Sequence, residues 1–301
     1  MKIGILGPAG TFSETAATLW LKETGYGKSE PAGVTINYYE TIFDVSESLL
    51  RKEVDYGIVP IENSLEGSVG ETLDVLSSEN SGALQITGEV LVPIHICLLA
   101  KQKLKKIDPA EIRRVVSHPH ALAQCKQFLR ERLNGVELKS VDSTASAAKL
   151  AAEDEGIVAL ASEEAARKYG LTILEENVQC AVMPHDPARA YKDSVTRFAV
   201  LSSSSSRINT SPTGKDKTSL LIYLKDRPGA LYNVLGEFAQ RGINLTKIES
   251  RPSKRAMGDY MFHIDCEGHR EEEKIKEALK GVAMVVAVLK ILGSYPMAVD
   301  V

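Results

Sequence analysis

The same local pattern occurs four times in the first half of this chain: an apolar strand ends in a turn of small and hydroxyl residues, and a helix follows at once. Strands that alternate with helices form parallel sheets covered by helices on both faces. Ligands of such folds bind where the strands end. The pattern therefore predicts an α/β fold whose turns meet at a ligand site. The four turns are GILG-PAGTFSE from residue 4, GIVPI-ENSLEGSVGE from residue 57, VVS-HPHALAQC from residue 115 and KSVD-STASAAKLA from residue 139.

Hydrophobic periodicity places the elements around these turns. The apolar run 89–100 is too long for one short strand, so we expect it to cross between two lobes. A two-lobed architecture with a cleft is therefore favoured over one continuous sheet. Strands are expected over 2–7, 35–39, 56–61, 89–100, 113–117, 136–142 and 156–161, and helices over 14–23, 42–51, 70–77, 121–133, 145–153 and 162–169.

A serine-rich stretch, SSSSSRINTSPTG over 202–214, divides the chain into two domains. It cannot bury enough apolar surface to order itself, so a linker is expected over 202–216. The part after it has the order βαββαβ, which is typical of a ferredoxin-like domain. Its strands are expected over 218–225, 243–251, 259–266 and 284–292, and its helices over 229–240 and 270–280.

Composition excludes several classes of function. The net charge of −4, from 36 basic and 40 acidic side chains, favours neither nucleic acid nor an anionic membrane surface as a partner. No apolar run approaches the roughly 20 residues of a membrane-spanning helix. Cys97, Cys125, Cys180 and Cys266 form no C-x-x-C pair, and Met1 precedes a strand rather than a leader sequence. We expect a cytoplasmic protein without a structural zinc site or disulfides.

Each of the four turns alone is explained by helix capping, and Thr11 with Glu14 fits a capping box. A helix N-terminus also offers unpaired N–H groups and a partial positive charge, which bind carboxylate or phosphate. The repetition of such turns favours a cleft for a small polyanion.

Other kinds of site lack their sequence patterns. The glycines at 4, 7 and 10 are spaced G-x-x-G-x-x-G, whereas dinucleotide binding uses G-x-G-x-x-G, and no P-loop occurs. There is no G-x-S-x-G nucleophile turn. His118 and His120 lack a third ligand nearby, so a metal is not expected. We therefore expect neither a metal nor a cofactor.

The motifs GPAGTFSE (7–14), PIENSLEGSV (60–69), SHPHALAQC (117–125), DSTASAA (142–148) and TRF (196–198) resemble, in order and spacing, those of prephenate dehydratases. The stretch DRPGALYNVLGEFAQRGINLTKIESRP (226–252) resembles a regulatory ACT domain with its GAL and ESRP motifs. The resemblance implies a two-lobed, periplasmic-binding-protein-like catalytic domain over 1–201, with its second lobe inserted at about 96–175, and an ACT domain over 217–297. The stretch 181–192 is longer than is usual in that family.

The resemblance also implies an activity, the conversion of prephenate to phenylpyruvate with loss of carbon dioxide and water. Thr196 would give a hydrogen bond or proton to the departing hydroxyl, and Glu62 would be an acid or an orienting group. Arg197 would clamp a carboxylate, or would instead pair with a buried acid. Phe12 and Phe198 would enclose the ring. The remaining substrate-binding residues would be Thr11, Ser13, Asn63, Ser64, Ser143, Thr144 and Ala145.

Feedback inhibition by L-phenylalanine is implied for the second domain, between ACT domains of a homo-oligomer, either a dimer or a tetramer. No helical chorismate mutase segment precedes Met1, so we expect a monofunctional enzyme. An arogenate dehydratase or a non-catalytic solute-binding module remains an alternative. The effector-binding residues would be Gly229, Ala230, Leu231, Asn244, Glu249, Ser250 and Arg251.

Overall fold

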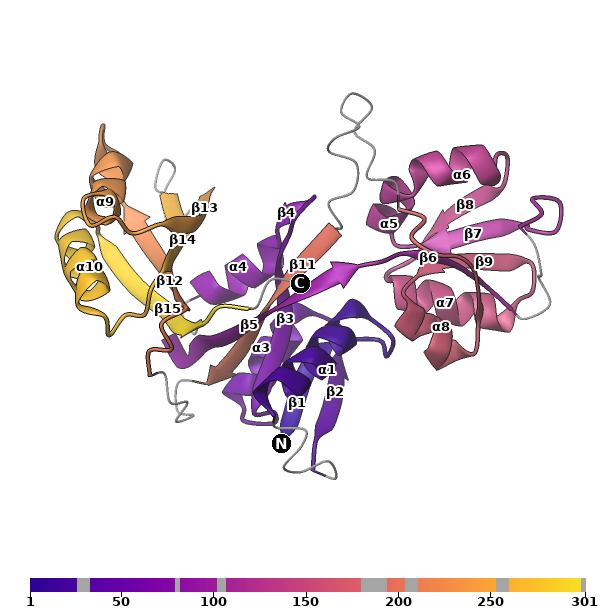
Figure 1. Ribbon diagram of the computed structural model, residues 1–301, viewed down its shortest axis with the longest axis horizontal. Helices are drawn as coiled ribbons and strands as arrows, with labels where there is room; N and C mark the ends of the chain where they lie inside the picture. Colours follow the sequence, from indigo (N-terminus) through magenta and orange to yellow (C-terminus); the bar gives the residue numbers. More distant parts are fainter. Residues whose placement is uncertain are drawn as a thin grey trace.

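The computed structural model describes residues 1–25, 33–78, 82–101, 107–179, 194–203, 211–252 and 260–298. Three α/β bodies lie in a row, with lobe 1 in the middle, lobe 2 on one side and a C-terminal domain on the other (Figure 1). The two-lobed fold and the ferredoxin-like arrangement of the C-terminal part are as predicted. Residues 204–210 of the predicted linker and the stretch 181–192 lie outside the described residues, while 202–203 end β11 and 216 begins β12.

Lobe 1 is built on a sheet with strand order β2-β1-β3-β11-β5, to which β4 adds at β3. The apolar run Ile3 to Ile5 is buried on both faces of this sheet. Helix α1 packs on one face, through Ala16 and Trp20, while α3 and α4 cover the other. The elements are β1 (Lys2–Leu6), α1 (Phe12–Thr24), β2 (Thr35–Tyr39), α3 (Ile42–Leu50), β3 (Tyr56–Asn63), β4 (Gly67–Ser68), α4 (Gly70–Ser77), β5 (Leu84–Ile94) and β11 (Ser194–Ser203).

Lobe 2 has a sheet of order β10-β6-β9-β7-β8. As predicted, the run 89–100 crosses between the lobes, because β5 ends at Ile94 in the first sheet and β6 begins at Cys97 in the second. An alanine-rich face of α7 and α8 packs closely on this sheet. The elements are β6 (Cys97–Ala100), β7 (Arg114–Ser117), α5 (Pro119–Gln124), α6 (Lys126–Arg132), β8 (Glu137–Ser140), α7 (Thr144–Glu153), β9 (Ile157–Ala161), α8 (Glu163–Tyr169) and β10 (Thr172–Glu175).

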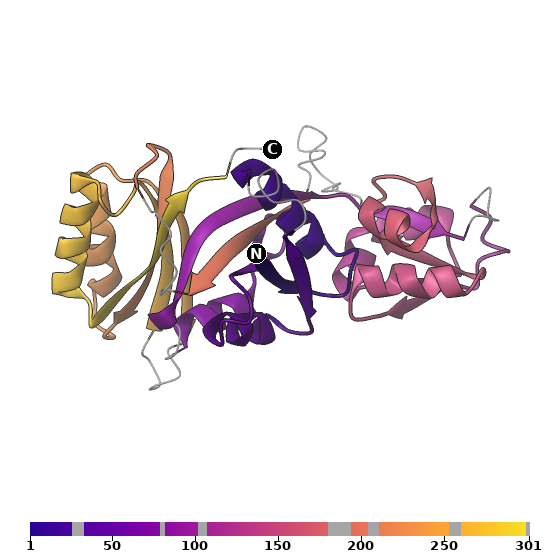
Figure 2. The same ribbon diagram turned by 90° about the horizontal axis from the view of Figure 1, so that it is seen from below.

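The C-terminal domain has the predicted βαββαβ order and an antiparallel sheet, β13-β14-β12-β15. Helices α9 and α10 cover its outer face, and its inner face packs on lobe 1 (Figure 2). Gly293 makes this packing possible, since a Cβ there would overlap the carbonyl oxygen of Ile86 in β5. The elements are β12 (Asp216–Leu224), α9 (Ala230–Ala239), β13 (Leu245–Pro252), β14 (Tyr260–Glu267), α10 (Glu273–Val285) and β15 (Val288–Pro296).

Candidate active site

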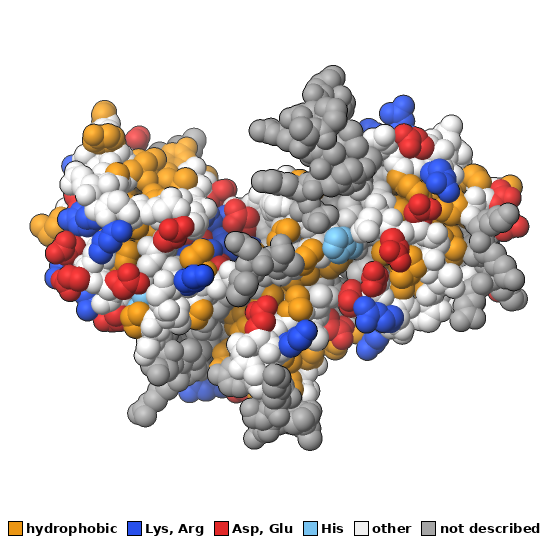
Figure 3. Space-filling model, viewed as in Figure 1, with side chains coloured by type: hydrophobic (Ala, Val, Ile, Leu, Met, Phe, Trp, Pro, Cys, Tyr) orange, Lys and Arg blue, Asp and Glu red, His pale blue; other side chains and the backbone are white. Residues whose placement is uncertain are grey.

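A cavity of about 340 Å³ lies between the two lobes, where the predicted turns meet. The space-filling view shows histidine side chains exposed in this region (Figure 3). Lobe 1 contributes the ends of β1 and β3 together with α1 and β11, and lobe 2 contributes the starts of α5 and α7. The predicted residues that line the cavity are Thr11, Phe12, Ser13, Asn63, Ser143, Thr144, Thr196 and Phe198.

The hydroxyl group of Thr196 is fixed by the neighbouring strand. The amide nitrogen of Asn63 donates to Thr196 Oγ1 at 2.9 Å and to Ser194 Oγ at 3.1 Å. The orientation of this amide is set in turn by Leu65 and Glu66, whose backbone N–H groups donate to Asn63 Oδ1. Because Thr196 Oγ1 accepts from Asn63, its own proton is left for an acceptor in the cavity.

The turn that opens the chain faces the same cavity. Thr11 begins α1 as its N-cap residue, but its hydroxyl donates to the Leu6 carbonyl oxygen instead of capping the helix. Glu14 reaches beyond Thr11 to accept from the Gly10 N–H. The predicted capping box is therefore wrong. The first N–H groups of α1 and the side chain of Ser13 are left to bind a ligand.

A second helix start faces the cavity from lobe 2. Ser143 is the N-cap residue of α7, and its hydroxyl oxygen accepts from the Ser146 N–H at 3.0 Å. Thr144 follows it at the cavity wall. Ala145 is fully buried and does not line the cavity. The partial positive ends of α1 and α7 thus face one space from opposite lobes.

A polar link joins the lobes at this cavity. Glu66 of lobe 1 pairs with His120 Nδ1 at 2.5 Å and accepts from Gln124 Nε2 at 2.9 Å. His118 stacks on His120, and its pKa is lowered by burial and by the neighbouring His120. Within the described ranges, no three His, Cys, Asp or Glu side chains converge on a position that could hold a metal ion.

Sequence reasoning missed part of this wall. Glu66 lies in the PIENSLEGSV motif and Gln124 in the SHPHALAQC motif. Nothing in the spacing of these motifs shows that the two side chains meet across the lobes. Ile94 and Ile96 also line the cavity, because the crossover between the lobes passes beside it. An apolar run gives no signal that distinguishes a cavity wall from a core.

Three other predicted residues do not line the cavity. Ser64 exchanges hydrogen bonds with the backbone of Val195 and so holds the end of β3 to β11. Glu62 and Arg197 lie opposite each other on the two strands, on the side that faces the C-terminal domain, where they pair with each other. Arg197 has thus adopted the second arrangement considered from the sequence, pairing with buried acids rather than clamping a ligand.

The predicted effector residues lie at two places in the C-terminal domain. Gly229, with φ of 79°, begins α9, and Ala230 and Leu231 form its first turn. Asn244 donates to Glu267. On β13 the side chains alternate, so the ESRP motif faces two directions. Glu249 accepts from Ser68 Oγ at 3.2 Å and Arg251 pairs with Asp74 at 2.9 Å, both in lobe 1, while Ser250 lies on the opposite face of the strand.

Comparison with known proteins identifies relatives along the whole chain. Residues 3–206 match the family model for prephenate dehydratase, and residues 218–283 match that for the ACT domain. A bifunctional chorismate mutase/prephenate dehydratase of Aquifex aeolicus is 42% identical over 99% of this chain and 74% of its own length. A prephenate dehydratase of Methanocaldococcus jannaschii is 39% identical over 96% of each chain.

A solved structure extends the similarity to three dimensions. The prephenate dehydratase of Arthrobacter aurescens, crystallised in complex with L-Phe, superposes with a TM-score of 0.81 at 33% identity. The match covers 98% of this chain and 90% of that one. The likeness therefore includes both lobes and the C-terminal domain. No helix among the described residues is long and apolar enough to cross a membrane.

Proposed function

Because the chain belongs to the prephenate dehydratase family, we propose that it converts prephenate to phenylpyruvate, carbon dioxide and water in phenylalanine biosynthesis, with feedback inhibition by L-phenylalanine. The observation that carries this proposal is the hydroxyl of Thr196, which Asn63 holds at the cavity with its proton free to donate.

The chemistry of the substrate fits this arrangement. Prephenate has a carboxylate on a quaternary ring carbon and a hydroxyl on the opposite ring carbon. When the bond to the carboxylate breaks, its electron pair enters the ring as carbon dioxide leaves, and the bond to the hydroxyl oxygen breaks. The ring becomes aromatic, so the enzyme needs chiefly to orient the substrate and assist the leaving hydroxide. A hydrogen bond from Thr196 to that oxygen provides the assistance, and the departing hydroxide takes a proton from solvent to become water.

The two carboxylates and the keto oxygen of prephenate would be held by both lobes. In lobe 1, the N–H groups at the start of α1, beside Thr11, and the Ser13 hydroxyl would supply donors. In lobe 2, Ser143 and Thr144 with the start of α7 would do the same. Asn63 completes the polar wall, while Ser64 holds the end of β3 to β11 behind it, and Phe12 and Phe198 enclose the ring. Glu62 faces away from the cavity and in this proposal orients Arg197.

The C-terminal domain would bind phenylalanine and join subunits. The start of α9, with Gly229, Ala230 and Leu231, provides N–H groups for a carboxylate, and Asn244 and Ser250 would complete the site with a second subunit. Large apolar side chains exposed on this domain, including Tyr232 at 78% and Met284 at 86%, support a homo-oligomer, either a dimer or a tetramer. Among the described cysteines, Cys97, Cys125 and Cys266 form no disulfide, which supports a cytoplasmic location.

The proposal is tested by kcat/KM for prephenate and for arogenate, with each aromatic product identified. A higher value for prephenate is expected. A higher value for arogenate would make the chain an arogenate dehydratase. Tight binding of prephenate without turnover would instead make it a solute-binding module.

A further inference from the structure

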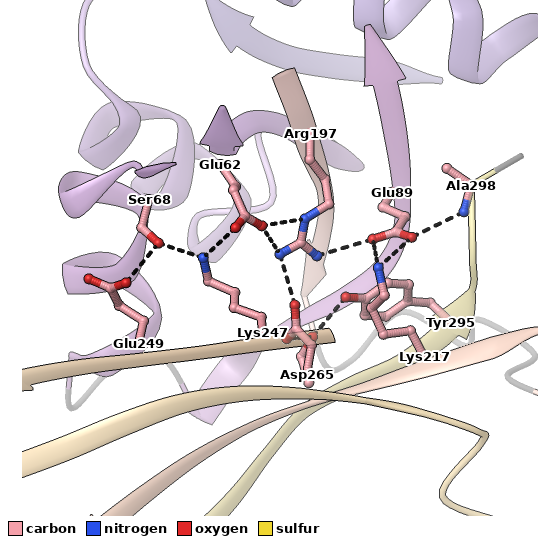
Figure 4. Close-up of polar contacts among 11 residues, drawn as sticks. Glu62, Ser68, Glu89, Arg197, Lys217, Lys247, Glu249, Asp265, Tyr295 and Ala298 are labelled. Carbon is pink, nitrogen blue, oxygen red and sulfur yellow. Dashed lines mark hydrogen bonds and ion pairs between the residues drawn. The ribbon is translucent and has the colours of Figure 1, made fainter. Parts of the chain in front are cut away.

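A buried group of charges joins lobe 1 to the C-terminal domain. We call it the interdomain ion network (Figure 4). It comprises Glu62, Glu89 and Arg197 of lobe 1 and Lys217, Lys247 and Asp265 of the C-terminal domain. All six side chains come from strands of the two sheets, and all of them except Glu62 are buried.

Arg197 is the centre of the network. Its guanidinium donates to Glu62 through Nε and Nη2 at 3.2 and 2.9 Å, to Glu89 through Nη1 at 3.1 Å, and to Asp265 through Nη2 at 2.8 Å. Arg197 is 8% exposed, Glu89 is 7% exposed and Asp265 is 3% exposed. Burial alone would lower the pKa of Arg197, but Asp265 and the other acids outweigh it and raise that pKa. The guanidinium stays charged and bridges the two domains.

The contacts of Asp265 make it a fixed anchor within the C-terminal domain. Its second oxygen accepts from Ser219 at 2.6 Å, and the Ser219 hydroxyl contacts the buried hydroxyl of Tyr295 at 2.7 Å. These residues lie on β14, β12 and β15, three adjacent strands of one sheet. A displacement of this sheet therefore carries the Asp265 carboxylate with it, and an ion without its partner is costly in a buried site.

The network lies directly behind the cavity. On β11 and β3, Thr196 is opposite Asn63, and Arg197 is opposite Glu62. Successive side chains of a strand point to opposite faces, so the first pair faces the cavity and the second faces the C-terminal domain. The register between the strands shifts immediately after Arg197, which interrupts the regular ladder at this point. A displacement of Arg197 is transmitted to Thr196 through a single peptide bond.

A second branch reaches the strand that carries the ESRP motif. Lys247 on β13 pairs with Glu62 Oε1 at 3.3 Å and donates to Ser68 Oγ. Ser68 donates in turn to Glu249, two residues further along β13. Movement of β13 would therefore disturb Glu62, which holds Arg197 from the other side.

From this geometry we propose that Arg197 is a positioning residue, through which the C-terminal domain sets the position of the Thr196 hydroxyl and phenylalanine lowers turnover. The inference rests on the proposed function and adds the structural route by which phenylalanine in the C-terminal domain affects Thr196. Phenylalanine bound beside β13 shifts the C-terminal sheet, Asp265 and Lys247 move with it, and Arg197 displaces Thr196 from its hydrogen bond with Asn63. The inhibition then acts on kcat more than on the KM for prephenate.

The test is Asp265→Asn, which removes one charge with almost no change in volume. Coupling between two sites of a protein is typically about 5- to 150-fold. We expect the inhibition of Asp265→Asn by saturating phenylalanine to fall to within about twofold, a loss of most of that coupling. The KM for prephenate should stay unchanged. Phenylalanine affinity, measured by calorimetry, should stay near that of the wild type, since Asp265 lies away from the start of α9.

Two further variants make the experiment specific. Ser68→Ala breaks the Lys247–Ser68–Glu249 branch at a partly exposed side chain, so it tests the route even where Asp265→Asn does not fold. His263→Gln is the matched control: His263 is buried on the same face of β14, two residues from Asp265, but contacts Ser77 rather than Arg197. Ser68→Ala should weaken inhibition, and His263→Gln should keep it.

Wild-type inhibition in both Asp265→Asn and Ser68→Ala would overturn the role of Arg197 and leave the proposed function intact. Equal loss of inhibition in His263→Gln would also overturn the role of Arg197. Any disturbance of the interface would then be enough to abolish inhibition by phenylalanine. Failure of the wild-type chain to form phenylpyruvate, or to bind phenylalanine, contradicts the proposed function itself.

Discussion

Thr196 and Arg197 are consecutive residues with separate tasks. The Thr196 hydroxyl faces the cavity and accepts from Asn63, whereas the Arg197 guanidinium is buried among acids of two domains. A threonine hydroxyl is a poor acid, so the contribution that we propose for Thr196 is a positioned hydrogen bond that strengthens as the leaving oxygen gains charge. Such a bond acts in the transition state more than in the bound substrate.

Thr196→Ala is therefore expected to lower kcat by about 10²- to 10³-fold, the usual cost of one lost donor to a developing anion. The KM for prephenate should change little, because the carboxylate-binding groups remain. Thr196→Ser keeps the hydroxyl and should recover most of the activity in the same steady-state assay. Near-normal turnover of the alanine variant would remove Thr196 from the mechanism.

His263 makes the stability of the molecule depend on pH. Its burial, opposed by Asp265 and Asp74 and assisted by Lys247 and Arg251, lowers its pKa to about 4. The unfolded chain, with an ordinary histidine pKa near 6.5, binds a proton more readily than the folded chain does. Stability from this group is therefore present above pH 6.5 and is lost as the pH falls towards 4.

Between pH 7 and pH 5 this one group should lower the free energy of unfolding by about 2 kcal/mol. Urea unfolding of the wild type and of His263→Gln at both pH values measures this contribution of His263, since glutamine does not titrate. The pH dependence of the variant should be smaller by that amount. Equal pH dependence in the two proteins would show that His263 is not buried in its neutral form.

Individual side chains were the hardest features to predict from the sequence. The motifs identified which strand ends meet at the cavity, because turns at the ends of strands in one sheet are brought together by the fold itself. They did not show which way Arg197 points, since that depends on Glu89 and Asp265, more than 60 residues away in opposite directions along the chain. The capping box failed for a similar reason, because Glu14 has a choice of backbone N–H groups.

Among the elements, the contact between β15 and β5 decides how the domains dock. The backbones approach so closely at Gly293 that no side chain fits. Neither strand can move away without breaking hydrogen bonds to its neighbour, which is β12 for β15 and β11 for β5. The buried side chains around this contact, among them Leu221, Met261 and Leu292, belong to the same core as those of lobe 1. The C-terminal sheet therefore shares a hydrophobic core with the catalytic part.

Gly293→Ala is expected to destabilise the protein by about 1–3 kcal/mol, as overpacking does, and so to lower the melting temperature by about 2–10 °C. Gly236→Ala is the matched control, because a Cβ there contacts only Gln240, at 3.8 Å, and replaces a glycine inside helix α9. The control should be neutral or slightly stabilising. Thermal unfolding of both variants decides the matter, and an unchanged melting temperature for Gly293→Ala would contradict the close packing.

Most strands and helices could be predicted, because their hydrophobic periodicity is a local property. The strands β10 and β11 were missed, and the last strand was expected over 284–292, whereas α10 continues to Val285 and β15 begins at Val288. The βαββαβ order of the C-terminal part and the crossover of 89–100 between the lobes were both confirmed. The packing of the C-terminal sheet on β5 could not be predicted. Gly293 looks like any other glycine in the sequence, and only the neighbouring backbone shows why it matters.

In the whole molecule, β11 connects the three bodies. It follows lobe 2 in the chain, lies between β3 and β5 of lobe 1, and carries on successive residues a cavity hydroxyl and the centre of the interdomain ion network. In the proposed mechanism, catalysis and regulation are therefore joined by one strand. Two separate domains connected only by a flexible linker would have no such dependence.

The rate of phenylpyruvate formation from prephenate, measured with and without phenylalanine on the full chain, tests this account most directly. We expect phenylpyruvate to form, and saturating phenylalanine to lower kcat by about fivefold or more, the lower end of typical coupling. Absence of phenylpyruvate, or a rate that phenylalanine leaves unchanged while it binds, would contradict the account.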